Sequence, residues 1–433
     1  MPATKVNEVY FIDGNRSPYL KARGRPGPFK AADIGVQTAK TLLRRLPVDA
    51  EEFDQVIVGN TGAGPTEANI ARVISLRLKM GEHIPAWTVH RNCASGLQAI
   101  DCAMRAISTG ESDLVLAGGV EVMSHMPLIW QEPFVHWFAD WGRAKSPLAK
   151  LKVLRKLKLK DMAPEFAILG GLSDQTVGMS MGQTTEKIAQ RFNISREEMD
   201  AYSVESHLRL ANAQENNLLE EITPIVDKKG KAYDKDDGVR PDSSVEKLAK
   251  LRPVFDKKFG KVTAGNSAQV TDGAAFVVMA SAEAVKKHKL PVIGKAIATQ
   301  WSGLDPSEMG LGPAYAIPAL LNNQGLKLED IDYWELNEAF AGQVLGCLKA
   351  LESADYCKEF IGLKGAFGTI PHETLNVDGG GVSIGHPVGS SGTRIALHLL
   401  DVLKRNNKKR GVATLCIGGG QGGAILLEQT GTL

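Results

Sequence analysis

The sequence is poor in cysteine and has no long apolar run. Its 433 residues include five cysteines, with no CxxC pair and no HExxH motif, which argues against a disulfide framework and against a zinc site. The first residues lack the apolar core of a signal peptide, and no apolar stretch approaches the roughly 18 residues of a membrane-spanning helix. We therefore expect a cytoplasmic protein with reduced thiols and no bound metal.

Neither sign of charge dominates. The chain has 51 lysine and arginine residues against 49 aspartate and glutamate residues, a formal net charge of +2. Bulk charge therefore indicates no particular partner, and no nucleic acid is expected. The length, together with a hydrophobic content of 43%, allows two or three domains with substantial cores.

What the chain does contain is an internal duplication. A strand, a helix and a strand at 8–14, 32–46 and 53–60 match a strand, a helix and a strand at 291–299, 312–325 and 331–340. A helix and a strand at 93–107 and 112–121 match a second pair at 389–403 and 411–421, and the segments 272–281 and 421–430 close the two halves. Alternating strands and helices predict an α/β protein with mainly parallel sheets covered by helices.

The duplication sets the expected domain boundaries. Residues 1–122 and 262–285 form the N-terminal half, 286–433 form the C-terminal half, and 123–261 are an inserted domain. A smaller insertion lies at 352–373. Because active-site residues gather at strand ends in such folds, we expect the polar residues at these points to converge: Asn60, Cys93, Asn337, His386 and Cys416.

Cys93 stands between an apolar run at 86–89 and a helical pattern that begins at Ala94. The positive end of a helix dipole and its unpaired N–H groups would favour a thiolate there. The small residues Ser95 and Gly96 would let a substrate approach closely. A buried structural cysteine, the commoner fate of this residue type, explains the same string.

His386 and Cys416 offer partners for that thiol. His386 lies between Gly385 and Pro387, on a turn that leads into a helix, where it could take the proton of Cys93; the alternative is a surface-loop histidine. Cys416 precedes three glycines whose N–H groups could face a substrate oxygen. Its thiol could move a proton at a substrate carbon, or it could be a small residue in a buried strand.

Asn337 and Glu338 follow an apolar strand and need polar partners there. Asn337 could hold a water in an oxyanion hole, and Glu338 could orient His386 or another polar group; strand-end capping is the simpler alternative. The glycine runs at 59–69 and 418–423 raise a rival, nucleotide binding. The first lacks the GxGxxG order and an acidic partner, and a strand pattern rather than a helix follows the second.

Taken in order, NCASG at 92–96, NEAF at 337–340, GHPVGSSG at 385–392 and CIGGGQG at 416–422 resemble the four signature blocks of the thiolases. The resemblance spans nearly the whole chain, duplication included. It implies two βαβαβαββ halves in five layers (αβαβα), with a loop domain inserted in the first half. It also implies a homodimer or homotetramer.

By the same resemblance, Cys93 is the acyl-accepting nucleophile, His386 activates it, and Cys416 is the acid/base at the α-carbon of acetyl-CoA. Asn337 positions an oxyanion-hole water, while the N–H groups of Cys93 and Gly418 form the other oxyanion hole. The implied reaction is a ping-pong exchange in which 3-ketoacyl-CoA and CoA give acetyl-CoA and a shortened acyl-CoA. Coenzyme A is a substrate, and no further cofactor is expected.

In layout the chain resembles the β-subunits of trifunctional fatty-acid oxidation complexes, which implies an α-subunit partner and a role in β-oxidation. Those subunits usually have HEAF and CAAGG-type blocks where this chain has NEAF and CIGGGQG. The alternatives are an acetoacetyl-CoA-forming acetyltransferase, a decarboxylating ketoacyl synthase, and an inactive CoA-binding or scaffold subunit.

The family's CoA contacts fall on less typical residues. The NASG block, whose serine touches the pantetheine, reads NSAQ at 266–269, so Ser267 and Ala268 are the expected contacts. Met181 is expected as a third contact. It follows Ser180, where short-chain biosynthetic members have a histidine. Both departures favour a substrate range beyond acetoacetyl-CoA.

The segment 129–160 combines aromatic and basic residues. Leucines alternate with lysines toward its end, and a helix would place Leu151, Leu154 and Leu157 on one face. Such a segment suits peripheral contact with an anionic membrane, another subunit or the CoA phosphates, and a solvated helix is the simplest alternative. Three of the six tryptophans lie in it: Trp130, Trp137 and Trp141.

Overall fold

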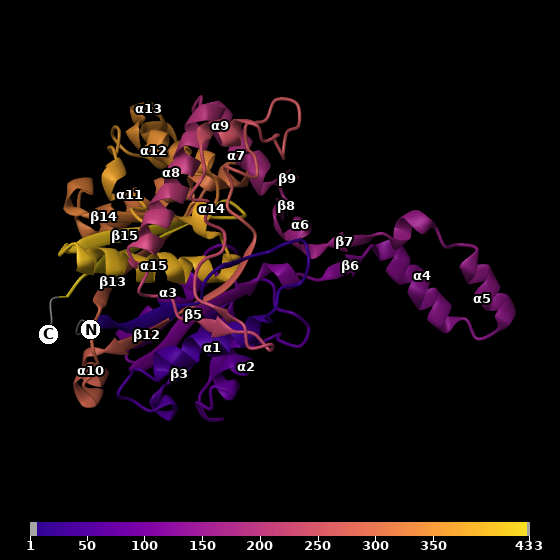
Figure 1. Ribbon diagram of the computed structural model, residues 1–433, viewed down its shortest axis with the longest axis horizontal. Helices are drawn as coiled ribbons and strands as arrows, with labels where there is room; N and C mark the ends of the chain where they lie inside the picture. Colours follow the sequence, from indigo (N-terminus) through magenta and orange to yellow (C-terminus); the bar gives the residue numbers. More distant parts are fainter. Residues whose placement is uncertain (1–6, 431–433) are drawn as a thin grey trace.

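The framework of the protein is one mixed β-sheet of ten strands, seen in a computed structural model that describes residues 7–430. The strands follow the order β14-β15-β16-β13-β1-β12-β5-β3-β4, with β2 beside β12. Figure 1 shows their arrangement. Their bounds are β1 (Val9–Arg16), β2 (Leu20–Lys21), β3 (Gln55–Gly59), β4 (Ala86–Val89), β5 (Leu114–Val122), β12 (Thr271–Ser281), β13 (Gly294–Gly303), β14 (Tyr333–Leu336), β15 (Arg410–Ile417) and β16 (Gln421–Glu428).

The two halves of the sheet repeat one another, as the duplication predicts. Outward from the centre, β1, β12, β5 and β3 are matched by β13, β16, β15 and β14. The expectation of mainly parallel sheets is wrong. Within the described residues only β3–β4, β3–β5 and β14–β15 pair in parallel, because the closing strands β12 and β16 run back between the other strands of their halves.

Helices cover the outer faces of the sheet and also fill the space between its halves, which gives the expected five layers (Figure 1). The central helices are α3 (Ser95–Ser108) and α15 (Val388–Arg405), which pack against each other. The first half is covered by α1 (Ala31–Leu43) and α2 (Ile70–Arg77), the second by α11 (Gly312–Gln324) with α12 (Ala341–Glu352) against it.

Alternation along β1 explains how one strand serves two layers. Tyr10 and Ile12 pack into the core beneath the outer helices, whereas Val9 and Phe11 pack with the central helices, as the two-residue period of a strand requires. The same strand joins the halves, since Val9–Phe11 pairs antiparallel with Gly294–Ala296 of β13. The functional residues are therefore positioned by one continuous framework.

The inserted region lies largely beside the C-terminal half. Its longest helices, α7 (Met181–Arg191) and α8 (Arg196–Glu215), pack against α12, and α8 also packs against α14 (Gly381–Ile384). Other short helices and strands are α6 (Ala167–Gly171), β8 (Ser173–Asp174), β9 (Met179–Ser180), β10 (Ile225–Val226), β11 (Ala232–Tyr233), α9 (Val245–Ala249), α10 (Ala282–His288) and α13 (Ala354–Tyr356).

Residues 128–166, called the arm below, project away from the body (Figure 1). Antiparallel β6 (Leu128–Trp130) and β7 (Pro164–Phe166) form its stalk, and α4 (Glu132–Arg143) and α5 (Pro147–Leu154) form its outer part. The expected helix through Leu157 is shorter, because α5 ends at Leu154 where like charges crowd at helical spacing over 152–156.

Within residues 7–430, no helix has both the length and the apolar character needed to cross a membrane.

Candidate active site

Cys93 lines a cavity of 520 Å³ between the two halves and the inserted region. It follows β4 and directly precedes Ala94, the N-cap of α3, so it stands at the beginning of a helix as predicted. Gly418 and Met181 line the same cavity, together with the loops at 61–63 and 167–176. The structure thus brings a cysteine of the first half to a glycine of the second.

The resting form of Cys93 differs from the expected thiolate. Burial raises the pKa of its thiol, while the N–H groups of Gly418 and of Cys93 itself lower it to a smaller extent. Desolvation therefore outweighs the helix end, and the neutral thiol needs a base to take its proton. The two N–H groups facing the sulfur are those that the thiolase resemblance assigns to an oxyanion hole.

His386 is held in the form that such a base requires. Its Nδ1 lies 2.6 Å from Ser391 Oγ, which in turn lies 3.2 Å from the Pro387 carbonyl oxygen. The hydroxyl donates to that carbonyl, so Nδ1 donates its proton and Nε2 is the accepting nitrogen. Nε2 is buried and has no partner within the described residues. Burial and the charge of Arg394 lower the pKa of His386 to about 4, so the imidazole is neutral near pH 7.

The turn before His386 depends on glycine. Gly385 has a φ of +107°, and a Cβ there would collide with the side chain of Thr271. A residue with a side chain would meet both backbone strain and a steric clash. The predicted rigid turn is therefore present, and α15 begins directly after it at Val388.

Cys416 lies near the end of β15 and is fully buried. Burial, followed by the neighbouring thiols of Cys93 and Cys347, raises its pKa well above the ordinary value. The interaction between their thiols shows that Cys93 and Cys416 lie close together, although they belong to different halves of the protein. Gly418 is tied to the same place, because its carbonyl oxygen accepts a hydrogen bond of 2.8 Å from Asn92 Nδ2.

Asn337 follows β14 and is fully buried. Neither its amide nitrogen nor its carbonyl oxygen has a hydrogen-bond partner among the described residues. Leaving both atoms unpaired is costly, so strand-end capping does not account for this side chain. An amide in this state fits a group that binds a water or a substrate oxygen.

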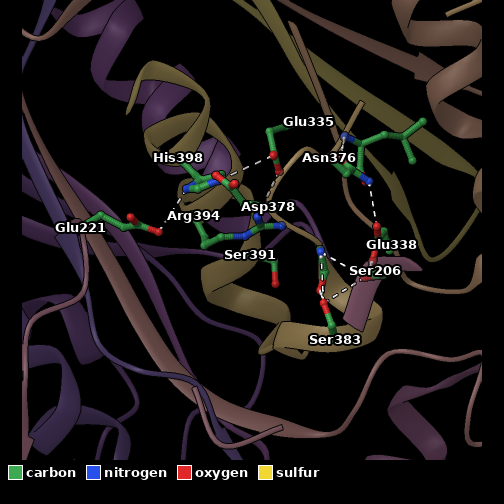
Figure 2. Close-up of polar contacts among 12 residues, drawn as sticks. Ser206, Glu221, Glu335, Glu338, Asn376, Asp378, Ser383, Ser391, Arg394 and His398 are labelled. Carbon is green, nitrogen blue, oxygen red and sulfur yellow. Dashed lines mark hydrogen bonds and ion pairs between the residues drawn. The ribbon is translucent and has the colours of Figure 1, made fainter. Parts of the chain in front are cut away.

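Glu338 does not orient His386. Its carboxylate accepts four hydrogen bonds, drawn in part in Figure 2, from Tyr202, Ser206, Asn376 and the N–H of Val382. These partners lie on α8 and on the segment 376–383 that leads into the histidine turn. Glu338 therefore anchors that segment, which corrects one of the two roles expected for it.

A buried ionic cluster that the sequence did not predict surrounds α15 (Figure 2). His398 forms ion pairs with Glu221 at 3.2 Å and Asp378 at 3.0 Å, while Arg394 donates to Glu335 at 3.0 Å. Burial opposes the charge on His398, but these carboxylates raise its pKa to about 10. The signal was Arg394 and His398 on a largely apolar helix, where charges require partners.

Glu121 is a further functional residue that no sequence motif predicted. Its buried carboxylate accepts hydrogen bonds from Asn60, the N–H groups of Thr61, Gly62 and Gly389, and the Thr61 hydroxyl. It connects a loop of the cavity wall to the start of α15. Asn60, expected to converge with the reacting groups, serves this brace instead.

Glycines let the two central helices meet. A Cβ on Gly96 would lie 2.8 Å from the Gly389 carbonyl oxygen, and a Cβ on Gly392 would lie 2.5 Å from the Leu97 nitrogen. Real side chains do not fit at such distances, so these glycines permit direct backbone contact. As a result the helix that follows Cys93 packs against the helix that follows His386.

The expected CoA contacts separate into two places. Met181 lines the cavity, whereas Ser267 and Ala268 lie outside it. Ser267 donates to the Thr263 carbonyl oxygen at 2.7 Å, and the Ala268 N–H donates to Ala339 at 2.9 Å. The first bond closes the loop on itself, and the second holds the loop against the NEAF segment. Within residues 7–430 no group of three or more His, Cys, Asp or Glu side chains is placed to hold a metal ion.

Comparisons with known proteins identify the family. Residues 9–283 match the family described as "Thiolase, N-terminal domain" and residues 290–429 match "Thiolase, C-terminal domain". A 3-ketoacyl-CoA thiolase of Yersinia pestis (strain Pestoides F) is 34% identical over 425 residues, which is 98% of this chain and 97% of that protein.

Solved structures agree with this over the full length. Human mitochondrial 3-ketoacyl-CoA thiolase in complex with CoA superposes with a TM-score of 0.85 at 35% identity, covering 98% of this chain and 99% of that one. The acetyl-CoA acetyltransferase of Bacillus anthracis has a TM-score of 0.85 at 32% identity, covering 99% and 100%.

Proposed function

The chain belongs to the thiolase family, and on that premise we propose that it cleaves 3-ketoacyl-CoA with CoA to give acetyl-CoA and a shortened acyl-CoA. The reaction is a ping-pong acyl transfer that serves fatty-acid β-oxidation and reverses as a Claisen condensation. The similar proteins of Yersinia pestis and human mitochondria are both named 3-ketoacyl-CoA thiolases.

One juxtaposition supports this proposal above all: the Cys93 sulfur lies beside the N–H groups of Cys93 and Gly418 and neighbours the Cys416 thiol. In the first half-reaction, His386 Nε2 accepts the Cys93 proton and the sulfur attacks the 3-keto carbon. The two N–H groups stabilise the resulting oxyanion. The bond between the α-carbon and the keto carbon then breaks, and Cys416 protonates the α-carbon to release acetyl-CoA.

Asn337 and His386 complete the sequence of steps. The enolate oxygen of the departing acetyl-CoA receives a hydrogen bond from a water held by Asn337 and from the imidazolium of His386. In the second half-reaction, the CoA thiol gives up its proton to Cys416 and its sulfur attacks the acyl-Cys93 thioester. The shortened acyl-CoA leaves, and the Cys93 thiolate takes back a proton from His386.

Acyl-CoA and CoA are the proposed ligands, with no further cofactor. Apolar side chains of Met123, Met126, Pro127, Ile168 and Leu172 line the cavity on the side of the arm. They support acyl chains longer than acetyl, because apolar chains gain free energy on leaving water.

We further propose a homodimer or homotetramer in the cytoplasm. β4 ends the sheet, and its Trp87 is 39% exposed, which suits pairing with a second copy. All five cysteines are free thiols, in keeping with a reducing compartment. An α-subunit of a β-oxidation complex is the further partner implied by the resemblance. Light scattering of the purified chain measures its own assembly state.

Mass spectrometry of the acyl intermediate tests the mechanism. After brief incubation with a 3-ketoacyl-CoA, the Cys93 peptide should gain the mass of the acyl group. Cys416→Ala should still acylate at Cys93 but lose turnover by on the order of 1,000-fold, whereas Cys93→Ala should do neither. Acylation on Cys416 alone would reverse the two roles, and full turnover by Cys416→Ala would refute the mechanism.

Thiolysis rates on substrates from acetoacetyl-CoA to 3-ketopalmitoyl-CoA distinguish the alternatives. We expect activity to extend to the longer chains. Turnover confined to acetoacetyl-CoA would instead favour an acetoacetyl-CoA-forming acetyltransferase. Binding of CoA without turnover of any substrate would favour an inactive scaffold subunit.

A further inference from the structure

The arm is the part of the molecule that the proposed reaction does not use. It spans under a tenth of the chain, yet ten of the twenty large apolar side chains exposed among the described residues lie on it. The most exposed are Leu159 at 83%, Leu148 at 67% and Phe138 at 63%. Exposed apolar surface gathered on one projection marks a contact surface.

Most of these side chains lie outside the aromatic core that holds the arm together, although Trp130 and Phe138 border that core through ring contacts with Phe134. Trp137 stacks on Phe134 and on Trp141, with ring centroids 5.5 and 5.6 Å apart. Its Nε1 donates a hydrogen bond of 2.9 Å to the Val153 carbonyl oxygen, which ties α4 to α5. The arm therefore has an aromatic core of its own, and a second apolar surface outside it.

The positive charge of the chain is concentrated at the same place. Residues 143–160 contain eight of the 51 lysines and arginines and none of the 49 aspartates and glutamates. Outside this stretch, acidic residues outnumber basic ones by 49 to 43. A basic, apolar projection on an otherwise acidic chain is complementary to an anionic surface.

We propose that the arm binds an anionic lipid surface and lies in its headgroup region. Lysines that alternate with leucines can keep their charged ends among the headgroups while their stems and the leucines enter the acyl boundary. Tryptophans prefer the same depth. A protein partner would select a shaped groove, whereas the exposed side chains here are spread over both helices and both strands of the stalk.

The proposal does not depend on the proposed reaction, but binding of the arm to a membrane also sets where the active-site cavity lies. Met126, Pro127, Ala167 and Ile168, at the base of the stalk, line the cavity that contains Cys93. The basic residues of the arm lie outside this cavity, so they do not serve the thiol site directly. A lipid-bound arm brings the cavity mouth close to the membrane in which long acyl chains partition.

Vesicle co-sedimentation of the full chain tests the surface. We expect binding to phosphatidylcholine vesicles that contain phosphatidylglycerol, little binding to phosphatidylcholine alone, and weaker binding at high salt. Changing Lys156, Lys158 and Lys160 to Gln should lower the partition coefficient roughly 100-fold, since each basic residue near an anionic surface accounts for about fivefold. Changing Phe138 and Leu159 to Ser should lower it at least about tenfold.

A matched control removes the same charge from the body: Lys228→Gln, Lys286→Gln and Lys364→Gln together should leave binding unchanged. Every variant should retain wild-type cleavage of acetoacetyl-CoA in solution, which shows that the fold survives. The proposal is overturned if the control weakens binding as much as the arm variants do. It is also overturned if wild-type protein stays in the supernatant with anionic vesicles, which would assign the arm to a protein partner.

Discussion

The two halves of this protein place an asparagine at the same point of the repeat and use it differently. Asn60 follows β3 and donates to the Val120 carbonyl oxygen at 2.8 Å and to Glu121 at 3.1 Å. Asn337 follows β14, and neither atom of its amide has a partner within the described residues. Duplication has copied the framework, but at this point of the repeat only the second copy contributes to the chemistry: Asn60 braces the fold, whereas the Asn337 amide is free to bind a water or a substrate oxygen.

The register of the strands explains the difference. Gly59 pairs with Gly119 in the first half and Leu336 pairs with Thr414 in the second. Two residues beyond each partner stand Glu121 and Cys416. Glu121, whose carboxylate accepts a hydrogen bond from Asn60, is therefore replaced at the equivalent point by Cys416, the second active-site thiol. The Asn337 side chain therefore has no carboxylate to bind, and only its backbone N–H bonds to β15, at 2.9 Å from the Thr414 carbonyl oxygen.

Replacing each asparagine by alanine should separate the catalytic role of Asn337 from the structural role of Asn60. Asn337→Ala should lower kcat for thiolysis by roughly 100-fold, as loss of an oxyanion-stabilising group does, and leave the free energy of unfolding unchanged. Asn60→Ala should lower the free energy of unfolding by about 1–3 kcal/mol because Glu121 loses a donor, with a much smaller effect on kcat. Turnover assays and denaturant titrations measure both, and equal losses in the two variants would contradict the distinction.

Substitution of a glycine by alanine tests the contact between the two central helices. Gly392→Ala puts a Cβ against the backbone of Leu97 and should destabilise the protein by about 1–3 kcal/mol. Gly142→Ala on α4 is the matched control. A Cβ there meets no atom within 4 Å, so the change should be neutral or slightly stabilising. Thermal unfolding would count against the packing argument if both substitutions had the same effect.

The smallest effect concerns pH. Burial raises the pKa of Cys93 and lowers that of His386 to about 4. Neither group then titrates between about pH 5 and 8. The rate of Cys93 alkylation by iodoacetamide should stay low across this range and rise as the pH approaches the raised thiol pKa, because the thiolate is the reactive form. An inflection near pH 7 that disappears in His386→Ala would show a thiolate–imidazolium pair instead.

Local pattern predicted the repeated elements well, because apolar periodicity along a strand or helix is a property of neighbouring residues. Strand direction was missed, since the position of β12 beside β1 depends on residues far apart in the chain. The same distinction between local pattern and distant contacts applies to the active site. Cys93, His386 and Cys416 lie in recognisable blocks, but the partners of His398 come from the inserted region and from the segment before α14, and only folding brings them together.

The stalk of the arm has a consequence for how such a protein changes over time. The Ala167 N–H donates to the Pro127 carbonyl oxygen at 3.0 Å, so the two points where the arm leaves the body are already in contact. The whole of 128–166 can be gained, lost or exchanged between them while the cavity wall keeps its shape. Where the protein works and what it catalyses are thereby open to separate selection.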